Sequence, residues 1–496
     1  MNKVRAFVVG LLLSAIVMSR TEPTLALDHL EVSPTSKPDS ELVVGNAQII
    51  DLSLADAVYL GLRDNRAIRG AYLQRITQKF DLRVAEDQFA PKLVLSGRSI
   101  AYHSQEGHDN TLEVIPASTL TTELGTRFSL AWTNQLDQAN TSGQTRSSGV
   151  SLSVIQPLFR DAGEEFNTAP VRLARLTEQI NRLSLKSTVS QTVTQIVRAY
   201  REFLRAQEQV RLAHDALERS RQLLEINKAL ITAGRMAAFE IIQTEADGAM
   251  QELGVEEANN QLATSRRELL RLLALDIGTV MQASDCLQAK HVTIDAAQAQ
   301  QIALENQPEY LTQLIANEQA KINLKVAQNQ RLSDVSLVGG GNYERHGFSE
   351  TQGDIAARRW NGYVGVQVDI PIGDMSRQQG EVRAQVDVRS QVLRLKEARQ
   401  LLEQSVGDAV RDVGTRWRQY EIAQRARDLS LKKLDFERQK LKVGRSSNFQ
   451  VLSFESDLRN AESARLNVLL SYLNAQTQLD LQLGMTLESW QIAIND

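Results

Sequence analysis

The sequence has 496 residues, and its 56 Lys and Arg against 60 Asp and Glu give a formal net charge of −4. This balance excludes a generally basic nucleic-acid binder, and 23% charged residues with only nine prolines argue against wholesale disorder. The only cysteine, Cys286, excludes a disulfide framework and a multi-cysteine metal site.

Residues 1–26 are expected to be an export signal peptide. Lys3 and Arg5 precede an apolar stretch from Ala6 to Met18, and the segment ends in small residues at Ala26. Its removal leaves 53 basic against 59 acidic residues, a net charge of −6. A buried N-terminal helix is the alternative, and the polar, proline-containing segment that follows disfavours it. We expect residues 27–51 to form an N-terminal extension.

Three segments recur in the second half of the chain in the same order. Residues 230–242 recur as 440–452, residues 151–157 resemble 365–371, and residues 93–97 resemble 335–339. The offsets are 210, 214 and 242, so the first half carries 28 extra residues between Gly97 and Val150. This pattern indicates an internal duplication.

Each half is expected to contain short helices, strands and a long helical hairpin. In the first half these are residues 52–91, 92–160 and 161–285, where Ser53 with Asp56 indicates a helix start. In the second half they are a linker with helices (286–332), strands (333–372) and a hairpin (373–484), with Pro308 as a helix break. Residues 485–496 are expected to be a C-terminal tail.

Apolar residues follow a seven-residue period in both long helices. In the first they are Val189, Ile196, Phe203, Val210, Leu217, Leu224 and Ile231; in the second they are Val406, Val413, Tyr420, Leu434 and Leu441, with Arg427 interrupting the period. This period predicts coiled-coil packing, whereas an ordinary amphipathic helix would drift off it. The segment 170–232 would span ~95 Å as a helix, about the summed length of the two shorter helices of that half. Each long helix is therefore expected to run beside two short ones, giving four columns per chain.

Alternating segments between the helices predict membrane strands. Val150, Leu152 and Val154 interleave with serines, and Val364, Val366 and Val368 interleave with polar residues or glycine. A lipid-facing barrel needs this alternation; a soluble two-stranded ribbon is the alternative. No apolar run beyond residue 20 reaches the roughly 18 residues of a membrane helix, so a chain that crosses a bilayer would do so with strands.

The number of crossings in each half should be even, because the helices leave and return on the same side. The second half shows two strands, and the first shows three candidates near residues 93–102, 125–134 and 149–158, of which we expect one not to cross. Four strands per chain are fewer than the ~8 of the smallest barrels. Open edges are forbidden in lipid, so oligomerisation is required, and three copies would give 12 strands.

The motifs together resemble the outer-membrane efflux protein family typified by TolC. They are Leu52-Ser53-Leu54-Ala55-Asp56 with Asp64-Asn65, Gln156-Pro157-Leu158-Phe159, and the paired turns at Gly234 and Gly444. The resemblance implies a mainly α fold with a membrane β-barrel portion, in which long coiled-coil hairpins form an α-barrel. It also implies a homotrimer in the outer membrane that extends into the periplasm, with a periplasmic adaptor and an inner-membrane pump as partners.

The resemblance also assigns roles to residues at the turns. The tips that would contact the adaptor are Gly234, Arg235, Gly444, Arg445 and Ser446. Family members often narrow the entrance with acidic residues after the second turn; here those positions are Gln450 and Ser453, and their first-half counterparts are Glu240 and Gln243. The alternative for the two arginines is that they only cap helix ends. The 28-residue insert has no simple counterpart in the plainest members.

No catalytic, cofactor or metal site is indicated. Gly339-Gly340-Gly341 is not followed by a helix pattern, and the six histidines are scattered. The sequence therefore favours a trimeric outer-membrane channel-tunnel, the exit duct of a tripartite efflux or type I secretion system, over an enzyme or a nucleic-acid binder. The alternative is a periplasmic adaptor or coiled-coil scaffold protein, although adaptors normally have one helical hairpin. The cargo (drug, metal ion or protein) stays open.

Overall fold

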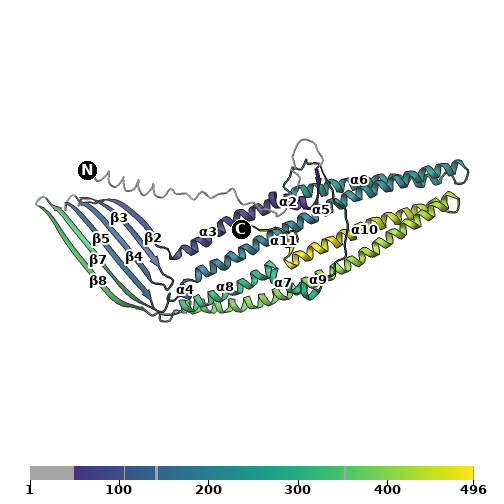
Figure 1. The fold of residues 1–496 in the computed structure, drawn as a ribbon. Helices are drawn as coiled ribbons and strands as arrows, with labels where there is room; N and C mark the ends of the chain where they lie inside the picture. The colour runs from purple at the N-terminus through teal and green to yellow at the C-terminus, as the bar shows by residue number, and fades with distance from the viewer. Residues whose placement is uncertain (1–49, 105–106, 140–142, 351–352, 495–496) are drawn as a thin grey trace.

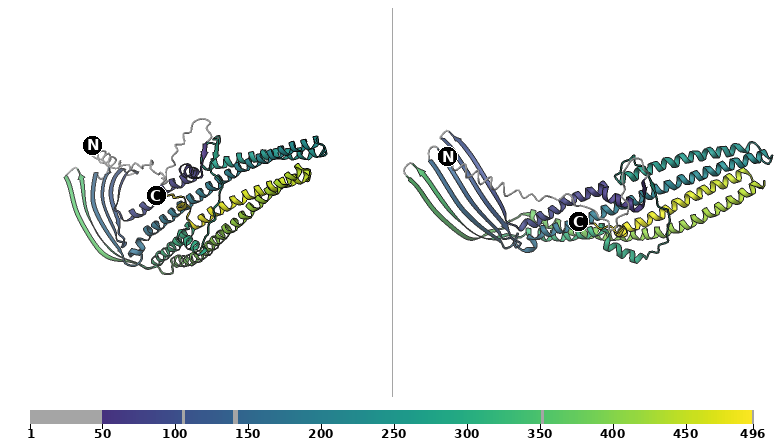
Figure 2. Two further views of the ribbon diagram at one scale, coloured as in Figure 1. Left: turned by 45° about the vertical axis from the view of Figure 1, so that its right-hand side comes forward. Right: turned by 45° about the horizontal axis from the view of Figure 1, so that its top comes forward.

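The structure, a computed structural model, describes residues 50–104, 107–139, 143–350 and 353–494. The expected signal peptide and nearly all of the expected N-terminal extension lie outside these residues. The described chain is elongated, with a curved sheet at one end and two helical hairpin tips at the other (Figure 1, Figure 2).

The first half begins with α2 (Leu54–Asp64) and α3 (Arg66–Glu86), followed by a short 3-10 helix, Asp87–Phe89. Ser53 and Asp56 form the expected capping box. The Asn65 side chain accepts hydrogen bonds from the backbone N–H groups of Ala67 and Ile68 and so starts α3. After the strands come α4 (Glu164–Asn167), the long α5 (Ala169–Thr232) and α6 (Glu240–Leu272).

The second half repeats this order with α7 (Ala296–Asn306), α8 (Pro308–Gln330), two strands, the long α9 (Met375–Lys442) and α10 (Asn448–Leu483). Gln307 starts α8 as Asn65 starts α3, since its side chain accepts a 2.7 Å hydrogen bond from the backbone N–H of Tyr310. The short α11 (Thr486–Ser489) follows. Two short strands, β1 (Ile50–Leu52) and β6 (Met281–Ala283), pair in parallel and connect the start of the first half to its end.

The helices form four columns, as the lengths predicted. The 64-residue α5 runs beside α3 and then α6, and the 68-residue α9 runs beside α8 and then α10. The columns touch through α5 and α8 near the sheet and through α5 and α10 near the tips (Figure 1). The outer columns are therefore α3 with α6 on one side and α9 on the other.

The sheet has six strands rather than the four that the sequence predicted. Its order is β2-β3-β4-β5-β7-β8, with every neighbouring pair antiparallel. The strands are β2 (Lys92–Ser104), β3 (Gly107–Thr121), β4 (Arg127–Ala139), β5 (Gly143–Pro157), β7 (Asp334–Glu350) and β8 (Gly353–Asp369). The expectation that each half holds an even number is confirmed, but the first half has four strands, and all three candidates belong to it.

The strand that the sequence analysis missed is β3. Pro116 lies in its middle, and proline inside a run usually argues against a strand. The ladder with β4 stops at the pair Val114–Asn134 and resumes at Ala117–Ala131, so it is interrupted around Pro116, which has no N–H to donate. The 28-residue insert thus completes a second hairpin of the sheet.

The core is a series of seams between helices. Ile196 and Phe203, two of the heptad residues, are fully buried with Tyr200 in the cluster that also holds Leu52. The hydroxyl of Tyr200 donates to the Leu52 carbonyl at 2.8 Å and lies 2.7 Å from a carboxylate oxygen of Asp285. Burial and the bond to Asp285 raise the pKa of Tyr200. A separate apolar cluster of Leu223, Leu434, Leu441, Val451 and Leu458 holds the tip ends of the hairpins together.

A buried ion pair ties α3 to α5. Both terminal nitrogens of Arg75 bind the Glu178 carboxylate, at 2.9 and 2.5 Å, and both residues are less than 10% exposed. Removing one partner of such a pair leaves an uncompensated buried charge. By contrast, Arg69 pairs with Asp64 on the surface, where an ion pair contributes little.

We predict that Arg75→Met lowers the free energy of unfolding by about 3–5 kcal/mol, and that Arg69→Met lowers it by less than ~1 kcal/mol. The double variant Arg75→Met/Glu178→Met should recover much of the loss, because neither buried charge then remains. Arg182, which also pairs with Glu178 at 3.4 Å, is exposed to solvent. Denaturant titration of the detergent-solubilised protein, followed by circular dichroism, measures all three. Equal losses for Arg75→Met and Arg69→Met would show that the buried pair has no special role.

Candidate functional site at the hairpin tips

The turns at the two tips have the same backbone geometry. Gly234 and Gly444 are left-handed, with φ of +68° and +76°. The backbone N–H of Arg235 donates to the Leu230 carbonyl, and that of Arg445 to the Lys440 carbonyl, each at 2.9 Å. This closes each helix in a Schellman-type turn, for which glycine is the favoured residue.

The two tip arginines project from these turns without partners in the described part of the chain. Arg235 and Arg445 are exposed, and neither guanidinium forms an ion pair or a hydrogen bond with a described residue. The alternative in which these side chains cap the helix ends is therefore not what the structure shows. A free arginine at a tip is able to bind an external carbonyl or carboxylate.

Ser446, the other expected tip residue, is held within its own hairpin. Its hydroxyl donates to the Glu437 carboxylate at 2.6 Å, and Lys440 pairs with the same carboxylate at 3.0 Å. The hydrogen bonds from Ser446 and then Lys440 hold the pKa of the Glu437 carboxyl below its usual value. Ser446 therefore stiffens the second tip.

The four residues expected at the constriction lie on the first turns of α6 and α10. Glu240 and Gln450 are half-buried, and Gln243 and Ser453 are exposed. In the described chain none of the four side chains hydrogen-bonds to another of them. Their role in narrowing an entrance stays a prediction.

A buried polar cluster beneath the tips was missed by the sequence analysis. The Asn227 side-chain amide donates to Thr244 at 2.7 Å and to the Asn448 oxygen at 2.8 Å, and all three residues are at most 1% exposed. The amide nitrogen of Asn448 also lies 3.1 Å from the Thr244 hydroxyl. These residues come from α5, α6 and α10, so the cluster joins the two hairpins. The sequence contains one sign of this cluster. Asn227 lies three residues after Leu224 in the heptad pattern, at a core position that is usually apolar.

Ion pairs extend this connection along the hairpins. Glu455 of α10 is 4% exposed and binds Arg219 of α5 at 3.1 Å as well as Arg438 of α9. Asp247 of α6 pairs with Arg459 of α10 at 3.4 Å. A second carboxylate on Arg219, that of Glu462, lies 3.4 Å away, and burial raises the pKa of Glu462. The two tips are therefore fixed to each other as one unit.

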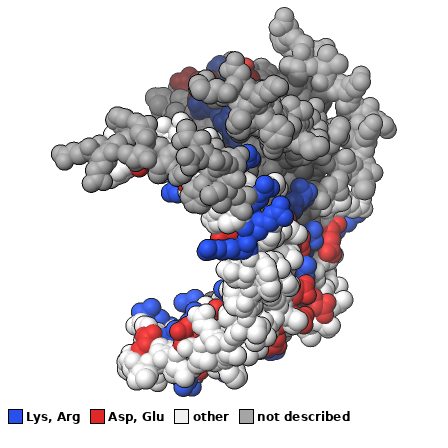
Figure 3. All heavy atoms as spheres, turned by 90° about the vertical axis from the view of Figure 1, so that its left-hand side faces the viewer, with Lys and Arg blue, Asp and Glu red and all other residues white. Residues whose placement is uncertain are grey.

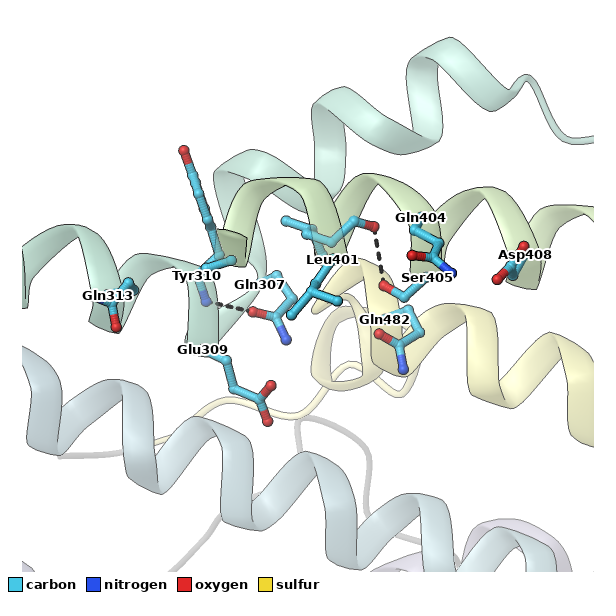
Figure 4. A pocket seen from close by; sticks show the side chains of 11 residues that line it. Gln307, Glu309, Tyr310, Gln313, Leu401, Gln404, Ser405, Asp408 and Gln482 are labelled. Atoms are coloured by element: carbon cyan, nitrogen blue, oxygen red, sulfur yellow. Dashed lines mark hydrogen bonds between the residues drawn. The ribbon is translucent and has the colours of Figure 1, made fainter. Parts of the chain in front are cut away.

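A groove of about 450 Å³ lies elsewhere, between α8, α9 and the end of α10 (Figure 4). It is open and lined mainly by amide and alkyl side chains, among them Gln307, Gln313, Leu401 and Gln482. Its two carboxylates, Glu309 and Asp408, do not converge on one point in Figure 4. No group of three or more His, Cys, Asp or Glu in the described residues could hold a metal ion.

Comparison with known proteins gives a family match for part of the chain and a shared fold for most of it. The model of the outer membrane efflux protein family matches residues 285–485, which include α7 to α10 and the second tip. No curated protein matches the chain. Among solved structures, the chain is similar to CusC with 16% identity and a TM-score of 0.67, over 88% of this chain and 93% of that one.

Two further solved structures show the same fold. CmeC, an outer membrane channel of Campylobacter jejuni, is 16% identical with a TM-score of 0.66, over 89% of this chain and 87% of that one. The open state of the Neisseria gonorrhoeae outer membrane channel MtrE is 15% identical with a TM-score of 0.64, over 92% and 96%. The family resemblance expected from the motifs is confirmed over residues 285–485, and the fold that it implies is confirmed over most of the chain. No helix in the described ranges is long and apolar enough to cross a membrane.

We predict that Gly444→Val abolishes export while assembly in the membrane is preserved. Valine is strained at a φ of +76°, so the turn must open and the tip change shape. Gly380→Val is the matched control, because Gly380 is an exposed residue inside α9 with open space around it. Export is measured as the survival of cells exposed to a toxic substrate of the system. The amount of the protein in the outer membrane is measured in parallel. Full export by Gly444→Val would contradict a role for the tip geometry.

Proposed function

We propose that three copies of this chain form a duct from the periplasm through the outer membrane, the exit channel of a tripartite efflux or type I secretion system. One observation supports this most strongly: the molecule has two unpaired sides, which run from the sheet to the tips. Each side has an open sheet edge and an exposed helix stripe, and the two sides are complementary. The family match and the shared fold support the same conclusion. The resemblance to the TolC-typified family is the basis for the number three.

The open edges of the sheet are β2 and β8. Their outer backbone groups have no partner strand in the described chain, and in lipid each unpaired group costs several kcal/mol. Pairing β8 of one copy with β2 of the next removes both edges. Three copies of six strands give 18 strands, a size that leaves an aqueous channel; this replaces the 12 strands expected from the sequence.

The two faces of the sheet differ as a channel wall requires. Directly paired residues share a face, and one face carries the cross-strand pairs Phe128–Val154 and Leu130–Leu152. The other face carries the Arg98–Glu113 ion pair and the hydrogen bond from Thr111 to Asp137, at 2.9 and 2.8 Å. This supports lipid on the first face and water on the second.

The outer helical columns carry exposed apolar stripes. On α6 the stripe has the spacing of a coiled-coil seam, and on α9 it repeats every seven residues with 61–66% exposure of each side chain. The α6 stripe consists of Phe239, the cap residue before the helix, and Ile242, Ala246, Ala249 and Leu253. The α9 stripe consists of Ile422, Leu429 and Phe436, and of Val443, the cap residue after the helix. Since no element of the described chain covers them, packing of α9 on α6 of the next copy would bury both.

Charges next to these stripes are complementary in part. Glu245, Glu256 and Glu257 on α6 form no ion pair with a described residue. On α9 neither do Lys432 and Lys442, nor the acidic Glu421 and Asp435. Opposite charges beside an apolar seam set the choice of partner helix in coiled coils. Closure of the helical columns into an α-barrel would bring these two sets together.

At the entrance, three copies would present six arginines, Arg235 and Arg445 from each, around one rim. Such a ring favours partner tips that carry carboxylate or carbonyl groups. We propose an adaptor as this partner and an inner-membrane pump beyond it. The equal order of elements in the two halves supports the proposed duplication. A role as a periplasmic adaptor is disfavoured, because this chain has two helical hairpins and a six-stranded sheet with an apolar face.

We predict that Leu253→Cys/Leu429→Cys, in a Cys286→Ser background, crosslinks into a ladder that ends at three copies. Leu253 lies 14 residues after Phe239 and Leu429 lies 14 before Val443, so the two are at the same height above the tips. Leu253→Cys/Asp435→Cys is the control, because Asp435 lies off the α9 stripe. Gel analysis of oxidised native outer membranes measures the ladder. A ladder that ends at two or at four, or functional monomers, would contradict the closure.

We predict that Arg235→Glu/Arg445→Glu weakens adaptor binding about tenfold at low salt and less at high salt, because salt screens exposed charges. Arg267→Glu/Lys321→Glu makes the same change of charge far from the tips and should leave the affinity unchanged. Adaptor affinity measured across a salt series distinguishes the two. An unchanged affinity in the tip variant would rule out docking on the arginines.

A further inference from the structure

Aromatic residues form a row across the apolar face of the sheet. Trp132 pairs with Val150, Val150 pairs with Tyr343, and Tyr343 pairs with Trp360, so the row crosses β4, β5, β7 and β8. The indole N–H of Trp132 donates to Ser148 on the same face at 3.0 Å. Aromatic rings of this kind gather where membrane meets water.

The row marks the far border of the apolar band. Trp360 is eight residues from Val368, about 26 Å along the strand at ~3.3 Å per residue. At a strand tilt of ~40° this is roughly 20 Å along the membrane normal, close to the ~25 Å band of membrane barrels. Because the helices are at the Val368 end, the row faces the external leaflet. Side chains one step beyond it lie at the height of the lipid headgroups.

Arginines occupy this height on the same face. Arg345 and Arg358 are directly opposite each other on β7 and β8, both exposed, and Arg146 on β5 lies diagonally beside Arg345. Two like charges directly opposite each other destabilise a sheet. Figure 3 shows Lys and Arg side chains between the grey atoms and a broad uncharged area at this end of the molecule.

The protein supplies no counter-charge to this cluster among its described side chains. None of the three arginines forms an ion pair with a described residue. The only acidic position on the apolar face of the described strands is Asp354 on β8, four residues from Arg358 and therefore roughly 13 Å away along the strand. The carboxylate on β7, Glu344, lies on the opposite face, where it is paired with Arg359 across the ladder. An anion from outside the chain would therefore relieve the repulsion.

We propose that Arg345 and Arg358, with Arg146, bind the phosphate groups of a phosphorylated lipid in the outer leaflet of the membrane. Arginine binds phosphate with two parallel hydrogen bonds, and the adjacent aromatic row would hold the acyl chains below the headgroup. The inference depends on the proposed function in two respects: the apolar face is taken as the lipid-facing one, and the helices are taken to lie in the periplasm. The proposed ligand of the three arginines is a lipid, and a soluble anion such as inorganic phosphate should not replace it.

The test uses the assembled protein in nanodiscs of phosphatidylcholine with a small fraction of lipid A, a phosphorylated glycolipid. Arg345→Gln/Arg358→Gln should retain lipid A about tenfold less well than the wild type in native mass spectrometry, since it loses two charge-assisted contacts. Arg359→Gln is the matched control: it removes the same charge one residue away, on the opposite face of β8, and should retain lipid A fully. Dephosphorylated lipid A should be retained weakly by all three.

Three results would overturn the proposal: equal retention by the double variant and the wild type, equal retention of dephosphorylated lipid, or stabilisation by inorganic phosphate as large as that by lipid A. Should the double variant fail to assemble, Arg358→Gln alone replaces it, with an expected loss of about threefold. Copy number is measured on the same samples. A wild type that does not assemble would contradict the proposed function, whereas unchanged lipid retention in an intact assembly contradicts the lipid site alone.

Discussion

The proposed assembly depends on one constraint, the hydrogen bonding of the two open sheet edges. In lipid, the outer backbone groups of β2 and β8 have no water to bind, so another strand must bind them. β2 and β8 are the two outermost strands of the sheet. The helices also have two outer sides, formed by α3 with α6 on one side and by α9 on the other. One rotation that relates each copy to the next would therefore pair β8 with β2 and the α9 stripe with the α6 stripe at the same time. A closed ring requires such a repeated contact.

The tips depend on a second set of interactions, within one chain. The buried cluster of Asn227, Thr244 and Asn448 and the pairs of Arg219 with Glu455 and Arg459 with Asp247 connect the two hairpins just beneath their turns. Hydrogen bonds among fully buried polar groups are costly to break. Each copy would thus present its two tips as one preformed unit, with Arg235 and Arg445 free for a partner.

Much of this architecture could be predicted from local sequence signals. The heptads predict long helices, the capping box at Ser53 predicts a helix start, and the glycines predict tight turns. The structure has helices and turns at these places. β3 was missed because Pro116 hides its alternation, and its pairing depends on neighbours that only the fold supplies. The tip network depends on partners more than 200 residues apart, and Asn448 has no polar counterpart at the repeat position of the first half, Ala238. The opposed Arg345 and Arg358 become visible only once the register of β7 and β8 is known.

The most direct test of the closure is to count the strands of the assembled wall. Electron cryomicroscopy of the protein in nanodiscs should show a threefold-symmetric particle whose membrane wall has 18 strands, with β8 of each copy hydrogen-bonded to β2 of the next. A wall of 12 strands that leaves β3 and β4 outside it, or a particle with a different number of copies, would contradict the account.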